Sequence, residues 1–303
     1  MRVFFADHHE LPLPAGHRFP IRKYRMLRER LISEEILSAE ELFEAPLVER
    51  SRLVAVHDPS YVEAVFSGSL DRRAVGRMGF PWSEGLVRRS CASVGGTLAA
   101  ARAALEDGIS GTLAGGTHHA LRDAGAGYCV FNDLAVTARA LIDDGLVERV
   151  LVLDLDVHQG DGTAAIFAGD ERVFTCSVHG ARNFPARKTE SDLDIPLPDD
   201  TGDRAYLEAV EQALEASLAR SNPDILLYQA GVDPLVDDRL GRLAVSSEAL
   251  FERDRLVLER SGAEGLPVAL TMGGGYADPI DLTVDAHVGT YRAVRDRMPA
   301  TSR

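Results

Sequence analysis

Short apolar runs alternate along the chain with longer stretches in which apolar residues recur every three or four positions. The longer spacing is typical of amphipathic helices, and a short apolar run bounded by Gly or Asp is typical of a buried strand. This alternation predicts parallel strands joined by crossover helices, and therefore an α/β fold. We expect strands at residues 3–6, 111–115, 150–154, 172–177, 224–229 and 267–272.

The clearest helical pattern follows Ser83, a residue type that favours the N-cap, and carries apolar residues from Val87 to Leu105 at steps of three and four. A similar pattern follows Asp203. A third runs from Ser247 to Gly262, whose lack of a side chain suits a left-handed helix end. Asp58-Pro59 predicts an N-cap followed by proline at the first helical position. Because no repeat, low-complexity segment or linker interrupts the pattern, we expect one domain over residues 1–303.

Composition excludes several classes of protein. Lys and Arg number 33 against 47 Asp and Glu, a formal charge of −14, which argues against direct nucleic-acid binding. With 45% hydrophobic and 26% charged residues, the chain is typical of a globular protein rather than a disordered one. It has neither a long apolar segment nor a signal-peptide pattern at its start, which predicts a cytoplasmic protein that does not enter a membrane. Cys91, Cys129 and Cys176 are odd in number and widely spaced, so we expect no disulfide framework.

Residues with chemical potential gather just after the predicted strands, where open parallel sheets place their sites. Asp154, Asp156 and His158 follow one strand at alternate positions and so project to one side. Two carboxylates and an imidazole crowded there would repel or lose solvation unless a cation neutralised them. The alternative is that the aspartates only cap the next helix. Asp233, after the strand at 224–229, is a turn residue when taken alone and a natural third metal ligand beside this cluster.

Two further segments complete a candidate site. His118 and His119 follow the strand at 111–115, and in a metal pocket each would need an acceptor for its second ring nitrogen, which Asp154 and Asp161 could supply. After the last strand, three glycines lead to Tyr276, and such a turn lets the backbone approach closely and presents a phenol. A divalent ion, paired histidines and a hydroxyl donor are the parts that amide hydrolysis needs.

These motifs resemble the histone deacetylase superfamily, which includes acetylpolyamine amidohydrolases and acetoin-utilisation proteins and has an arginase-like fold. The resemblance extends from about Leu11 to about Arg292 through G-G-T-H-H-A, G-Y-C-V-F-N-D, D-L-D-V-H-Q-G-D-G-T, the A-G-V-D turn and G-G-G-Y. It implies a single-domain, three-layer fold around a central, mostly parallel sheet. The segments at 237–241 and 191–194 are similar to the class IV type and its bacterial relatives.

The resemblance also implies roles for individual residues. The implied zinc ligands are Asp156, His158 and Asp233, and the implied His–Asp dyads are His118 with Asp154 and His119 with Asp161. Tyr276 matches the carbonyl-polarising tyrosine, and His119 would be the general base. Matching of positions to the family also implies two larger sets of residues. The acyl-lysine tunnel would be lined by Gly127, Tyr128, Phe184, Leu240 and Gly274, and a structural K⁺ or Na⁺ would lie near Asp154, Asp156, His158, Ser177 and Val178.

The expected function is metal-dependent removal of acyl groups from N-acyl-lysine in proteins or peptides. An acylpolyamine or other small acylamine is the alternative substrate, but Leu240 stands where polyamine-specific members carry an acidic residue. Arginase-like ureohydrolysis, which needs two metals, and a catalytically inactive binder of acylated lysine are more distant alternatives. An Asp, Asp, His ligand set would bind Zn²⁺ and could also hold Fe²⁺, Mn²⁺ or Co²⁺. The sequence does not indicate an oligomeric state.

Overall fold

Eight short strands form one sheet in the computed structural model, which describes residues 1–297; the last six positions of the predicted domain, 298–303, lie outside the described residues. The strand order is β2-β1-β3-β8-β7-β4-β5-β6, and every pair of neighbouring strands is parallel. The strands are β1 (Val3–Phe5), β2 (Leu42–Glu44), β3 (Ile109–Thr112), β4 (Val150–Asp154), β5 (Val173–Gly180), β6 (Leu193–Leu197), β7 (Ile225–Gln229) and β8 (Val268–Thr271).

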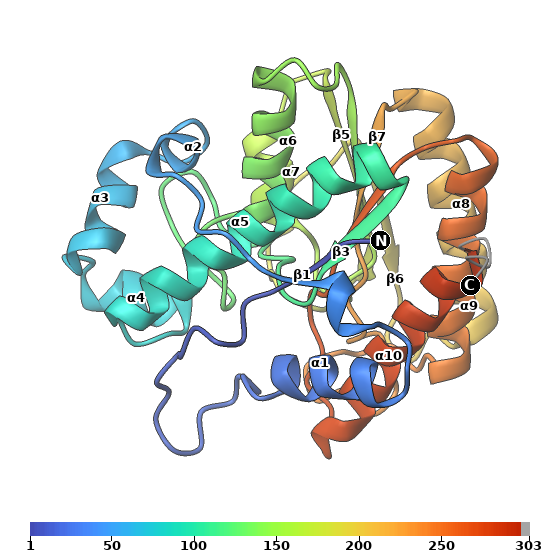
Figure 1. Ribbon diagram of the computed structural model, residues 1–303, viewed down its shortest axis with the longest axis horizontal. Coiled ribbons are helices and arrows are strands. Elements are labelled where there is room, and N and C mark those ends of the chain that lie inside the picture. The colour runs from blue at the N-terminus through green and yellow to red at the C-terminus, as the bar shows by residue number, and fades with distance from the viewer. Residues whose placement is uncertain (298–303) are drawn as a thin grey trace.

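Helices cover both faces of this sheet and produce three layers (Figure 1). The α-helices are α1 (Lys23–Ser33), α2 (Arg50–Val54), α3 (Pro59–Ser67), α4 (Arg72–Met78), α5 (Glu84–Asp107), α6 (Asp133–Asp143), α7 (Asp161–Phe167), α8 (Asp203–Ser221), α9 (Ser247–Ala263) and α10 (Ile280–Arg297), and a 3-10 helix spans Ala39–Glu41. The predicted α/β fold is confirmed.

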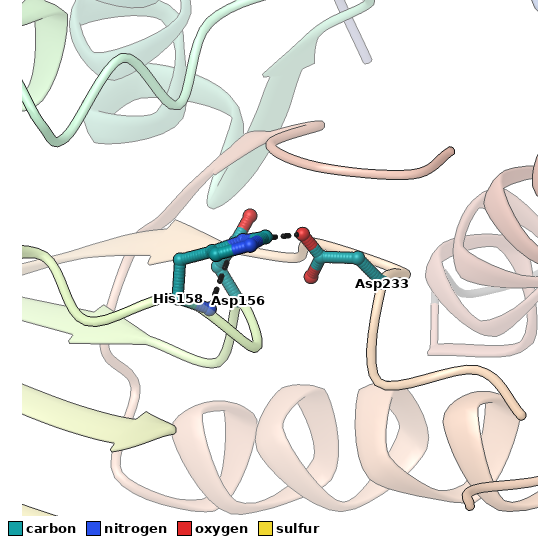
Figure 2. A group of neighbouring side chains, drawn as sticks. All are labelled: Asp156, His158 and Asp233. Carbon is teal, nitrogen blue, oxygen red and sulfur yellow. Dashed lines mark hydrogen bonds and ion pairs between the residues drawn. The ribbon is translucent and has the colours of Figure 1, made fainter. Parts of the chain in front are cut away.

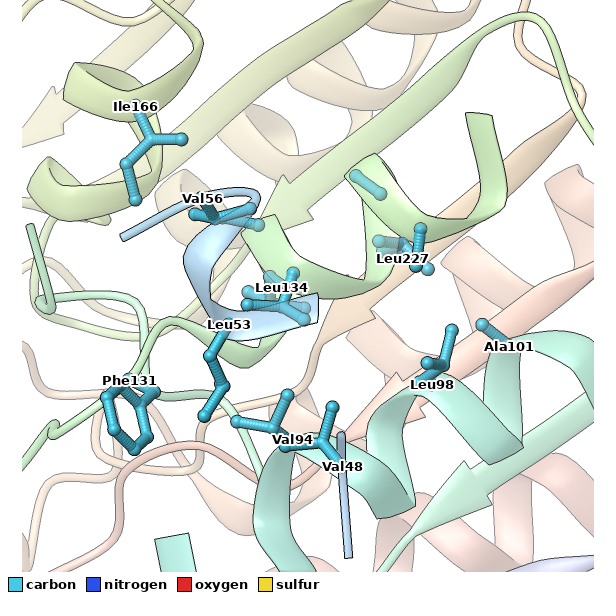
Figure 3. Packing of buried hydrophobic residues seen from close by; sticks show 14 of the residues in the cluster. Val48, Leu53, Val56, Val94, Leu98, Ala101, Phe131, Leu134, Ile166 and Leu227 are labelled. Carbon is cyan, nitrogen blue, oxygen red and sulfur yellow. The ribbon is translucent and has the colours of Figure 1, made fainter. Parts of the chain in front are cut away.

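The central strand β4 shows why the fold has two apolar interfaces. Val150 and Val152 pack into the cluster that contains residues of α5 and α6, whereas Leu151 and Leu153 pack into the cluster that contains residues of α8 and α9. Alternate residues of a strand point to opposite faces, so a strand covered on both faces must be apolar throughout. Figure 3 shows the first cluster, in which side chains of α5 meet those of α6 and of the segment around α2.

Helix α5 has the predicted N-cap, since the Ser83 hydroxyl accepts a hydrogen bond from the Leu86 amide at 3.0 Å. Glycine in this helix lets it approach the segment around Pro46 closely. A Cβ on Gly95 would lie 1.9 Å from the Pro46 carbonyl oxygen. The prediction at Asp58-Pro59 is also confirmed: Asp58 caps α3 through the Ser60 amide, and Pro59 is the first residue of the helix.

The structure corrects some element boundaries. The strand expected at 111–115 is β3, Ile109–Thr112, because Gly115 and Gly116 have φ of +80° and +78° and form a turn. Strands β2 and β6 were not predicted. Both lie at the edges of the sheet, where short, partly exposed and Pro-containing strands such as β6 are tolerated.

The predicted end of α9 at Gly262 is wrong. The helix continues to Ala263, and the left-handed residue after it is Gly265, with φ +67°. Gly262 instead permits close packing, since a Cβ there would lie 2.8 Å from Nε of Arg297. The three cysteines are free and buried, as expected. Within residues 1–297, no helix is both long and apolar enough to cross a membrane.

Candidate metal centre and active site

Asp156, His158 and Asp233 converge just beyond the ends of β4 and β7 (Figure 2). Their candidate ligand atoms all lie within 4.8 Å of one another, and Nδ1 of His158 is 3.0 Å from both Asp156 Oδ1 and Asp233 Oδ2. The other carboxylate oxygens are held by backbone amides. Gly274 N donates to Asp156 Oδ2 at 2.7 Å, and Val157 N donates to Asp233 Oδ1 at 2.8 Å. The backbone therefore aims one oxygen of each carboxylate toward the imidazole.

The electrostatics of these three residues fit a bound cation. Burial, together with the Asp156 carboxylate, raises the pKa of Asp233 to about 7. Burial alone would lower the pKa of His158, but the carboxylates of Asp233 and Asp156 outweigh it and raise that pKa to about 10. Asp233 and His158 thus keep their protons to higher pH than usual. The reason is that two buried carboxylates repel each other unless a positive charge lies between them. A divalent ion with oxygen and nitrogen ligands would satisfy that need.

The adjacent histidines each contact one of the predicted aspartates. Nδ1 of His118 is 2.6 Å from Asp154 Oδ2, and Nδ1 of His119 is 2.6 Å from Asp161 Oδ1. Both rings are buried, and both line the same cavity as Asp156. An aspartate on Nδ1 orients each ring and leaves Nε2 directed away from that carboxylate.

The two histidines differ in charge because their surroundings differ. Burial would lower the pKa of His118, but the carboxylates of Asp154 and Asp156 outweigh it and raise that pKa to about 9. Burial lowers the pKa of His119 to about 4, and the charge of neighbouring His118 adds to this effect. The carboxylates therefore favour the charged form of His118 in the metal-free protein, whereas burial favours the neutral form of His119.

Asp133, within the G-Y-C-V-F-N-D motif, is a site residue to which sequence reasoning assigned no role. Its carboxylate accepts hydrogen bonds from the amides of Gly116 and Thr117 at 2.9 and 2.7 Å. It also accepts one from the Thr97 hydroxyl at 2.6 Å. The first turn of α6 thereby fixes the loop that presents His118 and His119.

Tyr276 directly follows the three glycines of the turn after β8. Its ring lines the cavity, and within residues 1–297 no protein group forms a hydrogen bond to its hydroxyl. Burial and nearby carboxylates raise the pKa of Tyr276 well above its usual value, so the phenol keeps its proton. The carboxylate of Asp238, in the segment singled out for its similarity to class IV, accepts the Tyr276 amide at 2.6 Å.

Lys23 gave no signal in the sequence because its partners lie about 250 positions away. Its buried Nζ donates to the carbonyl oxygens of Gly273 and Gly275 at 3.2 and 3.3 Å. Burial lowers the pKa of Lys23 to about 8, although the carboxylates of Asp233 and Asp156 oppose this shift. The lysine ties the turn that presents Tyr276 to the beginning of α1.

A cavity of about 530 Å³ opens above these groups, and all five residues predicted to line a tunnel contact it. Phe184 is 44% exposed and lies edge-on to His119, with ring centroids 4.8 Å apart. Gly127 has φ +53°, and a Cβ there would lie 2.6 Å from the His119 ring. Tyr128 belongs to an aromatic group with Phe19, Phe80 and Tyr276. Leu240 and Gly274 complete the predicted set.

The residues expected around a monovalent cation lie at neighbouring strand ends. Asp154 is opposite Ser177 in the pairing of β4 with β5, and Val178 follows in β5. Asp156 and His158 come directly after β4. The Ser177 hydroxyl lies 3.0 Å from Nδ1 of His179. Binding of K⁺ or Na⁺ here stays a prediction.

Comparison with known proteins identifies relatives along nearly the whole chain. The Histone deacetylase domain matches residues 17–290. An uncharacterized protein of Picosynechococcus sp. is 45% identical, with 97% of this chain and 98% of the relative covered. Acetoin utilization protein AcuC of Staphylococcus aureus is 31% identical, with 86% and 72% covered. Histone deacetylase 2 of Arabidopsis thaliana is 28% identical, with 86% and 70% covered.

Solved structures agree with these relatives. A histone deacetylase homolog crystallised with SAHA superimposes with a TM-score of 0.85 at 25% identity, covering 98% of this chain and 84% of that one. A homolog from Aquifex aeolicus has a TM-score of 0.83 at 22% identity, with the same coverage, and supports the fold. The chain belongs to the histone deacetylase family.

Proposed function

We propose that this deacetylase-family hydrolase removes acyl groups from N-acyl-lysine in proteins or peptides and depends on a divalent metal. One observation carries the proposal: the convergent set Asp156, His158 and Asp233 lies beside two His–Asp pairs and a tyrosine with a free hydroxyl, around one cavity. Zn²⁺ is our first choice of metal, and Fe²⁺, Mn²⁺ and Co²⁺ also suit an Asp, Asp, His ligand set. Metal analysis after anaerobic purification would identify the ion.

Each side chain has a step that its charge and contacts support. When bound, the divalent ion would supply Lewis-acid activation of water and of the amide carbonyl. Neutral His119, oriented by Asp161, takes the proton from the attacking water and later passes it to the leaving amine. His118, held by Asp154, serves as an electrostatic partner or proton relay beside His119. The Tyr276 hydroxyl donates a hydrogen bond to the oxyanion.

The cavity favours acyl-lysine over a polyamine. A polyamine keeps further cationic amines outside the scissile amide, and these need carboxylates near the cavity. Among the described lining residues, the only carboxylate is Asp156 at the metal centre, whereas Arg77, Arg182 and Arg242 also line the cavity, the last two sharing an ion pair with Asp199 at 3.2 and 3.1 Å. Leu240 adds no charge. Asp199 offsets only part of the charge of the three arginines, and the excess of positive charge would disfavour spermidine-like substrates.

A rate panel tests this function. With the metal-loaded enzyme, we expect kcat/KM for acetyl-lysine peptides to exceed that for N-acetylspermidine by at least ~10-fold. Tyr276→Phe should lower kcat on the peptide by about 100-fold or more, because an oxyanion donor is lost. Faster hydrolysis of acetylspermidine would favour the small-amine alternative. An unchanged rate in Tyr276→Phe would contradict the role given to that hydroxyl, and peptide binding without hydrolysis would indicate an inactive binder.

A further inference from the structure

One wall of the cavity carries a buried cation that the proposed reaction does not use. Residues of α1 and α5, with Leu11, form this wall, which we call the α5 wall: Leu11, Tyr24, Leu86, Arg89 and Ser93. All five are buried, with Arg89 only 7% exposed. They line the same cavity as the metal-centre residues.

Arg89 lacks a partner of opposite charge. Within residues 1–297 no carboxylate oxygen lies within 4.0 Å of its guanidinium, which forms hydrogen bonds from Nη1 to the Ala6 carbonyl oxygen and with the Tyr24 hydroxyl. The carboxylate of Asp7 acts on the charge of Arg89, but it already forms an ion pair with Arg28 at 2.8 Å. The Arg89 guanidinium lies over the Tyr24 ring, with Cζ 4.6 Å from the ring centroid. A buried guanidinium without a carboxylate is costly unless an anion joins it.

The α5 wall also has hydrogen-bonding capacity that faces the cavity. The Arg89 guanidinium donates to the Tyr24 hydroxyl as well as to Ala6, which leaves other N–H groups of Arg89 and the O–H of Tyr24 unused, and Oγ of Ser93 forms no hydrogen bond to described protein atoms. None of them is sealed from solvent, because the cavity reaches all three residues. Three neighbouring side chains thus present unused donors to one space.

This wall adjoins the reaction centre. Nζ of Lys23 lies 5.3 Å from the centroid of the Tyr24 ring and 5.2 Å from that of the Tyr276 ring, so the two tyrosines flank one lysine. Leu11 and Leu86 add apolar surface to the same wall. An acyl chain that extends to this wall would therefore have both apolar side chains and a guanidinium to contact.

We propose that Arg89, with Tyr24 and Ser93, binds the distal carboxylate of the acyl group, so that the preferred substrates are lysines bearing ω-carboxyacyl groups such as succinyl or glutaryl. This inference rests on the proposed deacylase function and names its substrate class. Hydrolysis breaks the amide C–N bond; water gives its hydroxyl to the carbonyl carbon and a proton to the amine. The products are a dicarboxylate and a free lysine side chain.

A carboxylate suits this wall better than a neutral chain end. The guanidinium offers two N–H groups in a planar fork that matches both carboxylate oxygens, and the tyrosine and serine hydroxyls can fill the remaining lone pairs. A neutral alkyl end would leave the buried cation and its donors unpaired. Sites built to bind a polar group reject analogues that lack it by large factors.

The test compares length-matched peptides with the metal-loaded enzyme: succinyl-lysine against butyryl-lysine, and glutaryl-lysine against valeryl-lysine, with acetyl-lysine as reference. We expect kcat/KM to favour the carboxylated member of at least one pair by ~10-fold or more. Arg89→Met should lower that ratio at least ~10-fold while the acetyl-lysine rate changes less than about 3-fold.

Three further variants separate recognition from folding. Arg88→Met removes the same charge from the neighbouring, exposed position of α5, and we expect the wild-type ratio. Tyr24→Phe and Ser93→Ala each remove only a hydroxyl, and each should lower the ratio with little change in the melting temperature. They keep the inference testable if Arg89→Met, which also loses the contact to Ala6, does not fold.

Each outcome distinguishes the two proposals. If acetyl-lysine is hydrolysed but neutral chains are preferred in both pairs, or if the Arg89 and Tyr24 variants keep the wild-type ratio, the inference is wrong and the deacylase function stands. If Arg89→Met changes only inhibition by free acetate, the residue serves the released product and the inference is wrong. If no acyl-lysine is hydrolysed with any metal, the proposed function fails and the inference fails with it.

Discussion

Buried histidines in this protein carry different charges because they have different partners. Nδ1 of His57 donates to the Leu121 carbonyl oxygen at 2.8 Å, and its Nε2 accepts the Asn132 amide at 3.0 Å. A ring with one donor and one acceptor position filled is held in its neutral form, and burial lowers the pKa of His57 to about 4. His118, beside two carboxylates, has its pKa raised instead. Two adjacent carboxylates therefore outweigh burial at His118, whereas the single carboxylate of Asp161 does not outweigh it at His119.

His57 should make the fold sensitive to mild acid. Its folded-state pKa lies below that of the unfolded chain, so the unfolded state takes up a proton first as the pH falls below about 6.5, and stability decreases down to about pH 4. We expect the free energy of unfolding of His57→Gln to fall less than that of wild type between pH 7.5 and 4.5, by about 2 kcal/mol. Urea titrations across this range measure it. Exposed His8→Gln is the control, and equal pH slopes for wild type and His57→Gln would contradict the argument.

At the scale of elements, local pattern was a good guide where an element is buried on all sides or capped by its own residues. Strand β4 is apolar throughout because helices cover both its faces, and α5 starts at a serine that caps it. The edge strands β2 and β6 escaped prediction because only one neighbour and little burial determine them. Lys23 could not be predicted as a support for the glycine-rich turn, since no local pattern encodes a contact that the crossover topology creates.

A substitution in the glycine-rich turn after β8 would test whether the backbone of this turn positions the metal ligands. A Cβ on Gly274 would lie 1.9 Å from Asp233 Oδ2 and 2.8 Å from Asp156 Oδ2. We expect Gly274→Ala to displace both carboxylates and to weaken divalent-metal affinity by ~10-fold or more, as loss of ligand positioning does in metal sites. Metal titration by calorimetry measures the change.

The matched control for this variant is Gly289→Ala in α10, where an added Cβ meets no atom within 4 Å. Replacing a helical glycine by alanine should leave metal affinity unchanged and raise stability slightly. Wild-type affinity in Gly274→Ala would show that this turn does not constrain the ligands.

At the scale of the whole molecule, the parallel topology collects acidic side chains in one buried place. The end of β4 and the loops after β4 and β7 bring Asp154, Asp156, Asp233 and Asp238 into the interior, where Lys23 and the histidines oppose their charge. The sequence allowed the ligand set to be proposed, since each member follows an apolar strand. The strength of the repulsion between these carboxylates could be assessed only from the fold, because it depends on distances between segments up to about 80 positions apart.

Metal should therefore stabilise the entire fold. An ion that binds only the folded state at 100 times its Kd adds about 2.7 kcal/mol, which for a chain of this size raises the melting temperature by about 5 °C. We expect that rise when Zn²⁺ or another divalent ion is returned to chelator-treated protein. Asp233→Asn should lose most of the rise, because it removes one of the three proposed ligands. Asp237→Asn, an exposed neighbour in the same loop, should respond as wild type does. An equal rise in Asp233→Asn and wild type would place the stabilising ion elsewhere.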